Sequence, residues 1–421
     1  MIILNIQEIN KIVKGNINID YDFNINNIKT DSNEVVEGDI FMAINKGHNY
    51  INDAIKNGAK GIIIEKNIIY DIPTIKVKST IEALGLLANY IRNQYDIPVI
   101  AVTGSNGKTT TKELISLILS SKYNVLKSLK NQNNHIGLPN TLLKLNENFD
   151  VVVLELGMNH FKEISYLSKI CCPDYGVITN IGTAHIGNLG NKKNIFKAKL
   201  EILDGLKGSL LVNNNDKYLK KIKNNVIKID EKKLKLKNLK YGNKIEFDID
   251  NVHFIFNYPK HILIDLLIAI KVGLLFNISL EEISKVISTY QSSDGRLNII
   301  DGKYKIIDDS YNSNYESLIG SLSLLENNGY KIIVLGDMLE LGKYSKKYHK
   351  RVNKHLKKIK NKKVLLVGKY TKYIKGTHFD NIDDMINYLD KILVDGCTIY
   401  LKGSRAMNLD KIRKYIEKTV D

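Results

Sequence analysis

The sequence is poor in cysteine and contains no long apolar run. Its 421 residues include three cysteines, and no two of them form a Cys-x-x-Cys pair. The chain therefore offers no disulfide framework, a structural zinc site is not expected, and the thiols fit a reducing compartment. No stretch reaches about 18 apolar residues, and the first ten residues carry Glu8 without a basic leader. We expect neither a membrane span nor a secretory signal, and predict a cytoplasmic protein.

Arginine is also scarce, because only five of the 62 basic residues are arginines and the others are lysines. The formal net charge of +17 suggests nucleic-acid binding at first sight, since basic surfaces attract phosphate. A nucleic-acid footprint would concentrate arginine among aromatic residues, and the lysine-rich segments 232–240 and 357–363 lack that pattern. We interpret the charge as a solvated surface, with general attraction of an anionic substrate as the second interpretation. No nucleic-acid partner is predicted.

The rest of the composition is that of an ordinary globular protein. Hydrophobic residues make up 43% of the chain and charged residues 25%. These values exclude wholesale disorder, a collagen-like repeat and a coiled coil as the main architecture. At roughly 100 to 200 residues per domain, the length predicts about two to four domains.

Apolar runs and turn-forming segments divide the chain into three α/β units. We place them at 1–96, 97–294 and 295–421, with the second boundary in a polar, glycine-containing stretch at 292–295. In the first unit we expect short strands and helices at 39–44, 50–57, 61–64 and 80–92. This unit should form a small α/β domain.

The second unit contains buried-strand runs separated by helical segments. The runs lie at 99–102, 151–156, 175–178 and 210–212. Such alternation is typical of a parallel sheet with helices on both faces. The third unit restarts the pattern, with runs at 305–307, 331–335, 363–367 and 398–401. We predict an α/β nucleotide-binding fold for the second unit and a further α/β domain for the third.

The strongest local signal is a phosphate-binding loop at the end of the first central strand. Between the run at 99–102 and a helical pattern at 113–119 stands Gly104-Ser105-Asn106-Gly107-Lys108-Thr109-Thr110-Thr111. A phosphate site needs backbone N–H groups at a helix N-terminus, glycines that allow close approach, a lysine, and a hydroxyl for Mg²⁺. All four are present, although the two glycines are closer together than in the usual Walker A motif.

Two further residues follow central strands and are candidates for metal binding. Glu155 ends the run at 151–156, where a carboxylate can hold Mg²⁺, although a solvated strand-end glutamate is the alternative. His185 follows the run at 175–178 and should lie at the same carboxyl edge of the sheet, where ligands of such folds bind. From spacing alone, a structural role for His185 is the more common outcome.

The compressed loop, with its three threonines, resembles the ATP site of the Mur ligase family, the amide-forming ligases of peptidoglycan assembly. Further segments match motifs of that family in the same order, at 131–139, 155–160, 179–185, 198–202, 308–314, 335–342 and 402–405. The last three resemble the MurF branch in particular, which joins D-alanyl-D-alanine to UDP-N-acetylmuramoyl-tripeptide. The resemblance covers essentially the whole chain.

The resemblance implies an α/β, three-domain Mur ligase architecture. It assigns UDP-sugar binding to 1–96, a central parallel-sheet P-loop ATPase domain to 97–294, and a Rossmann-like C-terminal domain that binds the incoming dipeptide to 295–421. It also implies an ADP-forming reaction through an acyl phosphate, with ATP and two Mg²⁺ ions as cofactors. The expected partners are the UDP-linked tripeptide and D-alanyl-D-alanine, and the expected state is a monomer.

The resemblance also implies roles for individual residues. The catalytic set is Lys108, Asn133, Glu155, His185, Lys199 and Arg296. The ATP-binding set is Gly104, Ser105, Asn106, Gly107, Lys108, Thr109, Thr110, Arg296 and Asp309. The metal ligands are Thr109, Glu155, His185 and Lys199. The substrate-binding set is Thr30, Asp31, Ser32, His48, Asn312, Lys402, Ser404 and Arg405.

Three of these residues have a separate physical argument. Lys199 is a cation where Mg²⁺ is expected, and like charges repel at short range; in the ligases that this chain resembles, the matching lysine is carbamylated and so becomes an anion. Arg296 and Arg405 are two of the five arginines in a lysine-rich chain. The planar arginine side chain binds phosphate or carboxylate with two hydrogen bonds, although an ordinary surface role is the alternative for each.

The sequence departs from the MurF pattern at several positions. Asn33 stands where the branch usually has arginine after the Asp-Ser pair, and the loop before Gly47 and His48 is short. Both departures concern the expected UDP-sugar contacts. The segment 261–265 lacks the two asparagines that are usual there, which concerns the adenine contacts, and Tyr315 replaces a proline.

Two alternative functions remain at this stage. The first is a sister ligase that adds an amino acid, such as the tripeptide synthetase, an archaeal wall peptide ligase or a folylpolyglutamate synthase-like enzyme. The segment 336–340 differs from the Asp-Asn-Pro-Arg stretch of the tripeptide synthetase, which argues against that member. The second is a catalytically silent nucleotide-gated or nucleic-acid-binding protein, and the joint presence of Lys108, Glu155 and His185 argues against it.

Overall fold

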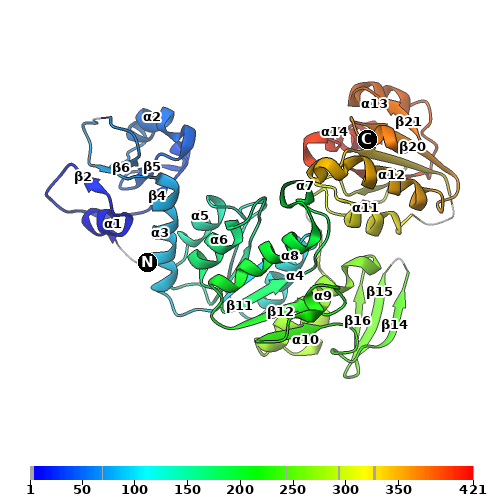
Figure 1. Ribbon diagram of the computed structural model, residues 1–421, viewed down its shortest axis with the longest axis horizontal. Coiled ribbons are helices and arrows are strands. Elements are labelled where there is room, and N and C mark those ends of the chain that lie inside the picture. Colours follow the sequence, from blue (N-terminus) through cyan, green and yellow to red (C-terminus); the bar gives the residue numbers. More distant parts are fainter. Residues whose placement is uncertain (1–3, 69, 243, 293, 326–328, 421) are drawn as a thin grey trace.

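The computed structural model describes residues 4–68, 70–242, 244–292, 294–325 and 329–420. Three α/β units follow one another along the chain, and the first and third lie on opposite sides of the second (Figure 1). Each of the sheets predicted for the three units is present. The domain boundaries themselves stay a prediction; Ser293, in the predicted second boundary, and residues 1–3 lie outside the described residues.

The first unit is built on a five-stranded sheet in which one edge strand is antiparallel. Its order is β2 (Asn16–Ile17), β7 (Thr74–Lys76), β6 (Gly61–Ile64), β5 (Ile40–Met42) and β4 (Ile28–Lys29). Beside it lie α1 (Ile6–Val13), α2 (Ile51–Lys56), α3 (Thr80–Asn93) and the short pair β1 (Leu4–Asn5) and β3 (Asn24–Ile25). The four elements expected from the sequence are confirmed, with ends that shift by one or two residues.

The second unit contains a six-stranded sheet whose strands are all parallel. Its order is β13 (Val226–Ile229), β12 (Ser209–Asn213), β11 (Tyr175–Ile178), β8 (Val99–Thr103), β10 (Val151–Glu155) and β9 (Val125–Lys127). Every residue of β8 and β10 is buried, because helices cover both faces of the sheet. The apolar runs of the sequence are therefore these strands.

The strand order places the phosphate loop at the point where the connections diverge. The chain leaves β8 towards β9 and β10 on one side, and later continues to β11, β12 and β13 on the other. In open α/β sheets, the crevice at the carboxyl ends of strands beside such a point is where ligands bind. The segments that follow β8, β10 and β11 are consequently neighbours in space.

Among the described residues, seven α-helices accompany the six-stranded sheet of the second unit. They are α4 (Lys108–Leu119), α5 (Gly137–Leu142), α6 (Glu163–Cys171), α7 (Ile186–Leu189), α8 (Lys192–Leu200), α9 (Leu263–Leu275) and α10 (Leu280–Ile287). The phosphate-loop helix α4 packs against α9, which is apolar around most of its circumference and buried for most of its length. A helix that is apolar on all sides belongs in a core, and α9 therefore fixes α4 firmly.

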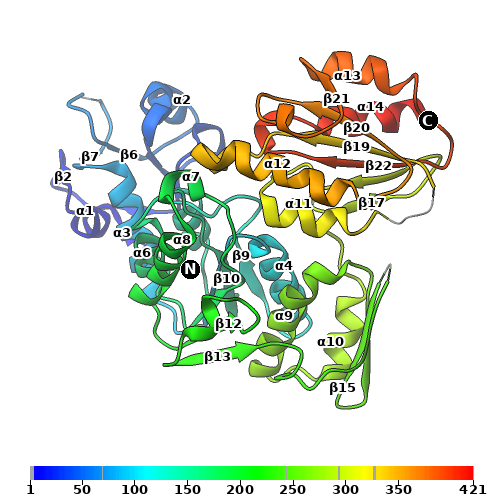
Figure 2. The ribbon, with the colours of Figure 1, turned by 45° about the vertical axis from the view of Figure 1, so that its right-hand side comes forward.

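An antiparallel sheet in the second unit was not anticipated from the sequence. It consists of β14 (Lys237–Tyr241), β15 (Ile245–Ile249) and β16 (Val252–Phe256), and it projects beside α9 and α10 (Figure 2). In β15 the buried residues alternate with partly exposed ones. This period-two pattern was present in the sequence and marks a sheet with one solvated face.

The third unit has a six-stranded sheet with one antiparallel edge strand. Its order is β17 (Asn298–Ile300), β18 (Lys305–Asp308), β22 (Thr398–Lys402), β19 (Lys331–Gly336), β20 (Lys362–Val367) and β21 (Thr377–Phe379). The helices α11 (Tyr315–Leu322), α12 (Ser345–Leu356), α13 (Ile382–Leu389) and α14 (Asp410–Val420) accompany it. Across the described residues, no helix is long and apolar enough to span a membrane.

Candidate functional site

The phosphate loop is shaped by two glycines that have no room for a side chain. A Cβ atom on Gly104 would collide with the hydroxyl of Thr179, and one on Gly107 would collide with the carboxylate of Asp265. Gly107 has a φ of 77° at the start of α4, a conformation that glycine adopts without strain. Asn180 holds the loop, because its backbone oxygen accepts from Ser105 N at 3.0 Å.

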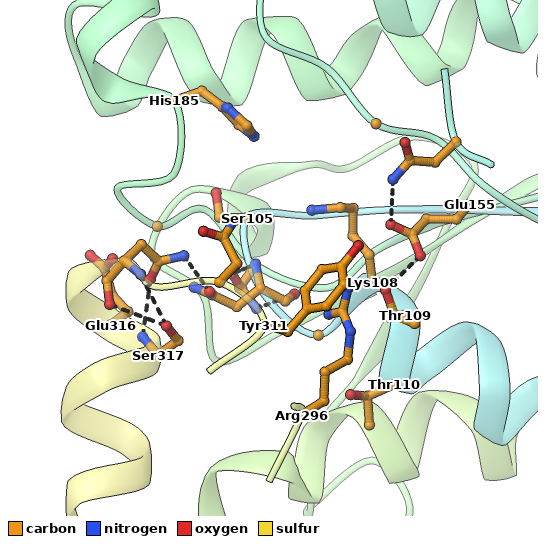
Figure 3. Close-up of a pocket in the computed structure, with 18 of the residues that line it drawn as sticks. Ser105, Lys108, Thr109, Thr110, Glu155, His185, Arg296, Tyr311, Glu316 and Ser317 are labelled. Atoms are coloured by element: carbon orange, nitrogen blue, oxygen red, sulfur yellow. Dashed lines mark hydrogen bonds between the residues drawn. The ribbon is translucent and has the colours of Figure 1, made fainter. Parts of the chain in front are cut away.

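Lys108 folds back over this loop and faces the groups that follow the neighbouring strands (Figure 3). Its Nζ donates to the backbone oxygen of Gly104 at 3.0 Å. Burial lowers the pKa of Lys108, and the negative charge of Glu155 opposes that shift. Lys108 is partly exposed in the cavity wall, where the ammonium could pair with a phosphate.

Glu155 links the phosphate loop to the neighbouring strand. The side chain ends β10 and is 2% exposed. Its Oε2 accepts from the hydroxyl of Thr109 at 2.7 Å, and its Oε1 accepts from Asn133 Nδ2 at 2.8 Å. The structure thus brings three predicted site residues from three separate segments into direct contact.

His185 lies across the same space, at the start of α7 (Figure 3). Burial, with the nearby positive charges of Lys108 and Lys199, lowers the pKa of His185 to about 3. The imidazole is therefore neutral at physiological pH, which is the form that binds a metal ion. Its buried Nδ1 makes no hydrogen bond within the described residues and lies 3.2 Å from Glu340 Oε2.

Lys199, on α8, is 1% exposed. Burial lowers the pKa of Lys199 well below its ordinary value; Lys108 adds to the shift, and Glu340 and Glu155 oppose it. Lys199 is therefore close enough to Lys108 and Glu155 to feel their charges. The other predicted metal ligands, Thr109, Glu155 and His185, line one large cavity, which is described next; Lys199 is not part of its wall.

A cavity of about 860 Å³ joins the phosphate loop to the third unit. Most of the predicted catalytic and ATP-binding residues line it together with residues from the third unit. The predicted residues in its wall are Ser105, Asn106, Gly107, Lys108, Thr109, Thr110, Asn133, Glu155, His185, Arg296, Asp309, Asn312 and Lys402. The sequence analysis placed these residues in two domains, and the structure brings them to one space.

The third unit contributes an arginine and a buried ion pair to this cavity. The guanidinium of Arg296 lies over the ring of Tyr311, 4.0 Å from its centroid (Figure 3). Lys402 Nζ is 2.6 Å from Asp309 Oδ2 and donates to the backbone oxygen of Asn312 at 3.0 Å. Burial raises the pKa of Asp309, and the positive charge of Lys402 opposes that shift. Asp309 was predicted to bind ATP and Lys402 to bind substrate, and the structure joins the two side chains in one ion pair.

The two remaining residues predicted for the dipeptide lie outside the cavity wall. Ser404 Oγ accepts from Leu339 N at 2.9 Å. Arg405 Nη1 donates to the hydroxyl of Tyr311 at 3.3 Å. Tyr311 is the same residue whose ring lies under the guanidinium of Arg296. Their role as substrate contacts stays a prediction.

The residues predicted for the UDP-sugar are likewise not brought to the phosphate loop. Thr30 Oγ1 accepts from Asn140 Nδ2 of the second unit at 2.8 Å, and Asp31 accepts from Asn33 N at 3.0 Å. Ser32 is buried, and His48 is buried with its Nδ1 3.1 Å from the backbone oxygen of Asn45. These four residues line no part of the large cavity, and their substrate role stays a prediction.

The sequence analysis did not single out two carboxylates of the third unit that reach the second. Glu316 accepts from Thr183 N and from Lys192 Nζ, each at 2.9 Å. Glu340 approaches His185 as described above. Glu340 belongs to the recognised segment 335–342, but no local pattern in that segment indicates that its side chain crosses between units.

Comparisons with known proteins agree with this arrangement. The Mur ligase middle domain matches residues 102–275, and the Mur ligase glutamate ligase domain matches residues 295–405. A UDP-N-acetylmuramoyl-tripeptide–D-alanyl-D-alanine ligase of Buchnera aphidicola is 35% identical over 404 residues, with 89% of this chain and 88% of that protein covered.

Two solved structures are also similar over nearly the whole chain. The crystal structure of MurF from Acinetobacter baumannii has a TM-score of 0.91 and 28% identity, and 99% of each chain is covered. MurF from Thermotoga maritima in complex with ADP has a TM-score of 0.84 and 26% identity, covering 94% of this chain and 97% of that one. From its sequence motifs, its three-unit fold and these matches, we conclude that the chain belongs to the Mur ligase family.

Proposed function

We propose that this chain joins D-alanyl-D-alanine to UDP-N-acetylmuramoyl-tripeptide and forms ADP and phosphate from ATP. The observation that carries this proposal is the single cavity in which the phosphate loop and Glu155 face Arg296, Asp309 and Lys402 of the third unit. The relatives that carry this activity in their names match almost the full length of the chain. We place the reaction in the cytoplasm and expect a monomer to perform it.

The chain's own residues supply most of what the phosphate tail of ATP needs. Backbone N–H groups at the start of α4 point into the cavity, and a helix N-terminus attracts anions. Lys108 and Arg296 add two positive charges from opposite units. They would stabilise the negative charge that shifts among phosphate oxygens when the γ-phosphoryl group is transferred.

The residues present also fit Mg²⁺. Thr109, Glu155 and the neutral, unpartnered His185 would hold it, and the bound metal would neutralise phosphate charge. Within the described residues, no group of three histidine, cysteine or acidic side chains is arranged to hold a metal ion. The remaining ligands must therefore come from phosphate, water or a modified side chain.

Lys199 is the candidate for that modified side chain. Burial lowers the pKa of Lys199 well below the ordinary value, which favours the neutral amine. A neutral amine adds to CO₂ to give a carbamate and releases one proton. The product is an anion next to Lys108, which would reverse the unfavourable charge at this position.

The proposed reaction has two chemical steps. The terminal carboxylate of the tripeptide attacks the γ-phosphorus and displaces ADP, which gives an acyl phosphate. The amine of the dipeptide then attacks the acyl carbon, loses a proton and displaces phosphate. Both steps require water to be excluded, and contacts between the second and third units, such as Asn314 with Asn106, would keep the cavity closed.

An acceptor-specificity assay tests this function. Purified protein, ATP, Mg²⁺ and the UDP-linked tripeptide are mixed with D-alanyl-D-alanine or with single amino acids, and products are identified by mass. We expect phosphate release and the pentapeptide product with the dipeptide alone. Equal or faster reaction with a free amino acid would overturn the proposal in favour of a sister ligase.

A further inference from the structure

Glu340 is a carboxylate of the third unit that reaches into the cationic part of the second. It belongs to the short helix η6 (Leu339–Tyr344), and its Oε2 lies 3.2 Å from His185 Nδ1. Burial lowers the pKa of Lys108 and of Lys199, and the negative charge of Glu340 opposes both shifts. Glu340 therefore lies within electrostatic range of three residues that the proposed reaction uses.

The position of Glu340 is fixed by a close contact between two backbones. A Cβ atom on Gly187, in α7, would lie 2.7 Å from Gly342 N and 2.9 Å from the backbone oxygen of Glu340. Beside this contact, the hydroxyl of Tyr344 donates to the backbone oxygen of Gly190 at 2.7 Å. There is no space for a side chain between α7 and η6, so the contact sets how far Glu340 extends across the interface.

Three other carboxylates near the cavity already have partners. Glu155 accepts hydrogen bonds from Thr109 and Asn133, Asp309 is paired with Lys402, and Glu316 accepts from Thr183 and Lys192. Each of these three carboxylates has a donor within 3 Å.

Glu340 differs from these carboxylates. Within the described residues no hydrogen bond to its side chain is found, and its nearest charged or polar contact is His185 Nδ1 at 3.2 Å. The Glu340 side chain is 32% exposed, and it contacts His185 of the cavity wall without itself lining that wall.

The proposed reaction brings a cation to this region. At neutral pH the amino group of a dipeptide is largely an ammonium. It must approach an acyl group near Lys108 and Arg296, whose charges repel it. A free carboxylate beside these groups would offset the repulsion and hold the amine in place.

We propose that Glu340 binds the ammonium group of the incoming dipeptide and holds it beside the site of acyl transfer, an inference that rests on the function proposed above. Glu340 is then a residue for the second chemical step, in which the held ammonium first releases one proton to water and the resulting neutral amine attacks the acyl carbon. The first step, in which the tripeptide carboxylate and ATP form the acyl phosphate, does not need it.

Two measurements on Glu340→Gln separate these steps. Acyl phosphate formation is followed without the dipeptide, by trapping the activated carboxyl group with borohydride and detecting the reduced product. Ligation is followed with the dipeptide present. Because glutamine keeps the shape and removes the charge, we expect the KM for D-alanyl-D-alanine to rise about 10- to 100-fold, while trapped acyl phosphate changes by less than about threefold.

A neutral analogue supplies a second readout. D-lactyl-D-alanine has a hydroxyl in place of the ammonium, so the wild type should bind it much more weakly than the dipeptide. In Glu340→Gln this preference for the charged ligand should largely disappear. Lys343→Ala, which changes an exposed residue of the same short helix, is the matched control and should leave both steps unchanged.

Three results would overturn the proposal. Loss of acyl phosphate formation in Glu340→Gln, in proportion to the loss of ligation, would show that Glu340 acts on His185 or on the nucleotide. An unchanged KM for the dipeptide, or an unchanged preference for the charged ligand, would show that it does not bind the ammonium. If the wild type forms acyl phosphate but does not use the dipeptide at all, the proposed function fails, and that failure is independent of this variant.

Discussion

At the phosphate loop, Asp265 shows how burial alone can set the charge of a side chain. It lies against Gly107, is 5% exposed, and its Oδ1 has no hydrogen-bond partner among the described residues. Burial raises the pKa of Asp265 to about 7. Between about pH 4 and pH 7 the folded chain therefore keeps a proton that the unfolded chain has released. Stability from this group is lost as the pH rises through that range.

We expect Asp265→Asn to remove this pH-dependent loss. An amide has the same shape and does not ionise, so the variant should gain stability relative to the wild type as the pH rises. The gain at pH 8 should exceed that at pH 5 by about 2 kcal/mol. Urea unfolding at the two pH values, without nucleotide or Mg²⁺, measures the difference. Equal effects at both pH values would contradict this explanation.

Lys199 leads to a second prediction at the residue scale. If its carbamate completes the metal site, Lys199→Ala should reduce ligase activity about 100-fold or more, because a buried anion is lost. Short carboxylates such as acetate should restore part of the activity by occupying the vacated space. A carbamate signal should also appear by NMR when the wild type is equilibrated with ¹³C-labelled CO₂. The role would be refuted if Lys199→Ala kept its activity, if short carboxylates did not restore the activity of an impaired variant, or if the wild type showed no carbamate signal.

The site residues that could be predicted from the sequence are those whose position follows from local structure. Lys108 and Thr109 begin the helix after a buried strand, and Glu155 ends the neighbouring strand, so strand order alone brings them together. The Asp309–Lys402 pair and the approach of Glu340 to His185 depend on how distant segments pack. No local pattern records such contacts.

At the scale of elements, the close contact between α7 and η6 depends on the absence of a side chain at Gly187. The backbone atoms of Gly342 and Glu340 lie where a side chain at Gly187 would be placed. The third unit can therefore approach the second this closely only while position 187 has no Cβ.

We expect Gly187→Ala to separate η6 from α7 by steric overlap. Ligation should fall at least about tenfold, because the third unit and its residues move away from the cavity, and acyl phosphate formation should also fall, because Arg296 moves with that unit. Parallel rate measurements of both steps test this. Gly302→Ala is the control, since a Cβ there meets no atom closer than 3.9 Å. A Gly187 variant with normal ligation would show that the contact is dispensable.

The same scale explains which elements could be predicted. The parallel strands were found because they are buried on both faces and read as continuous apolar runs. The sheet of β14, β15 and β16 was missed because lysine and asparagine interrupt its alternation, as in β14, which is exposed along most of its length. Two-residue strands such as β2 and β4 are too short to give any periodic signal.

At the scale of the whole molecule, one cavity depends on the second and third units, and the described residues in its wall include none from the first unit. Arg296, Asp309 and Lys402 complete a site that begins at the phosphate loop. Thr30 and His48, in the first unit, lie outside that cavity. If Thr30 and His48 bind the UDP end of the substrate, as the sequence predicts, that end is held apart from the reacting carboxylate.

The most direct measurement follows an oxygen atom through the reaction. The terminal carboxylate of the UDP-linked tripeptide is labelled with ¹⁸O, and the phosphate released during ligation with D-alanyl-D-alanine is analysed by mass. If the cavity joins ATP to that carboxylate, one labelled oxygen should appear in each phosphate. Phosphate released without the label, or at the same rate in the absence of the dipeptide, would contradict the account.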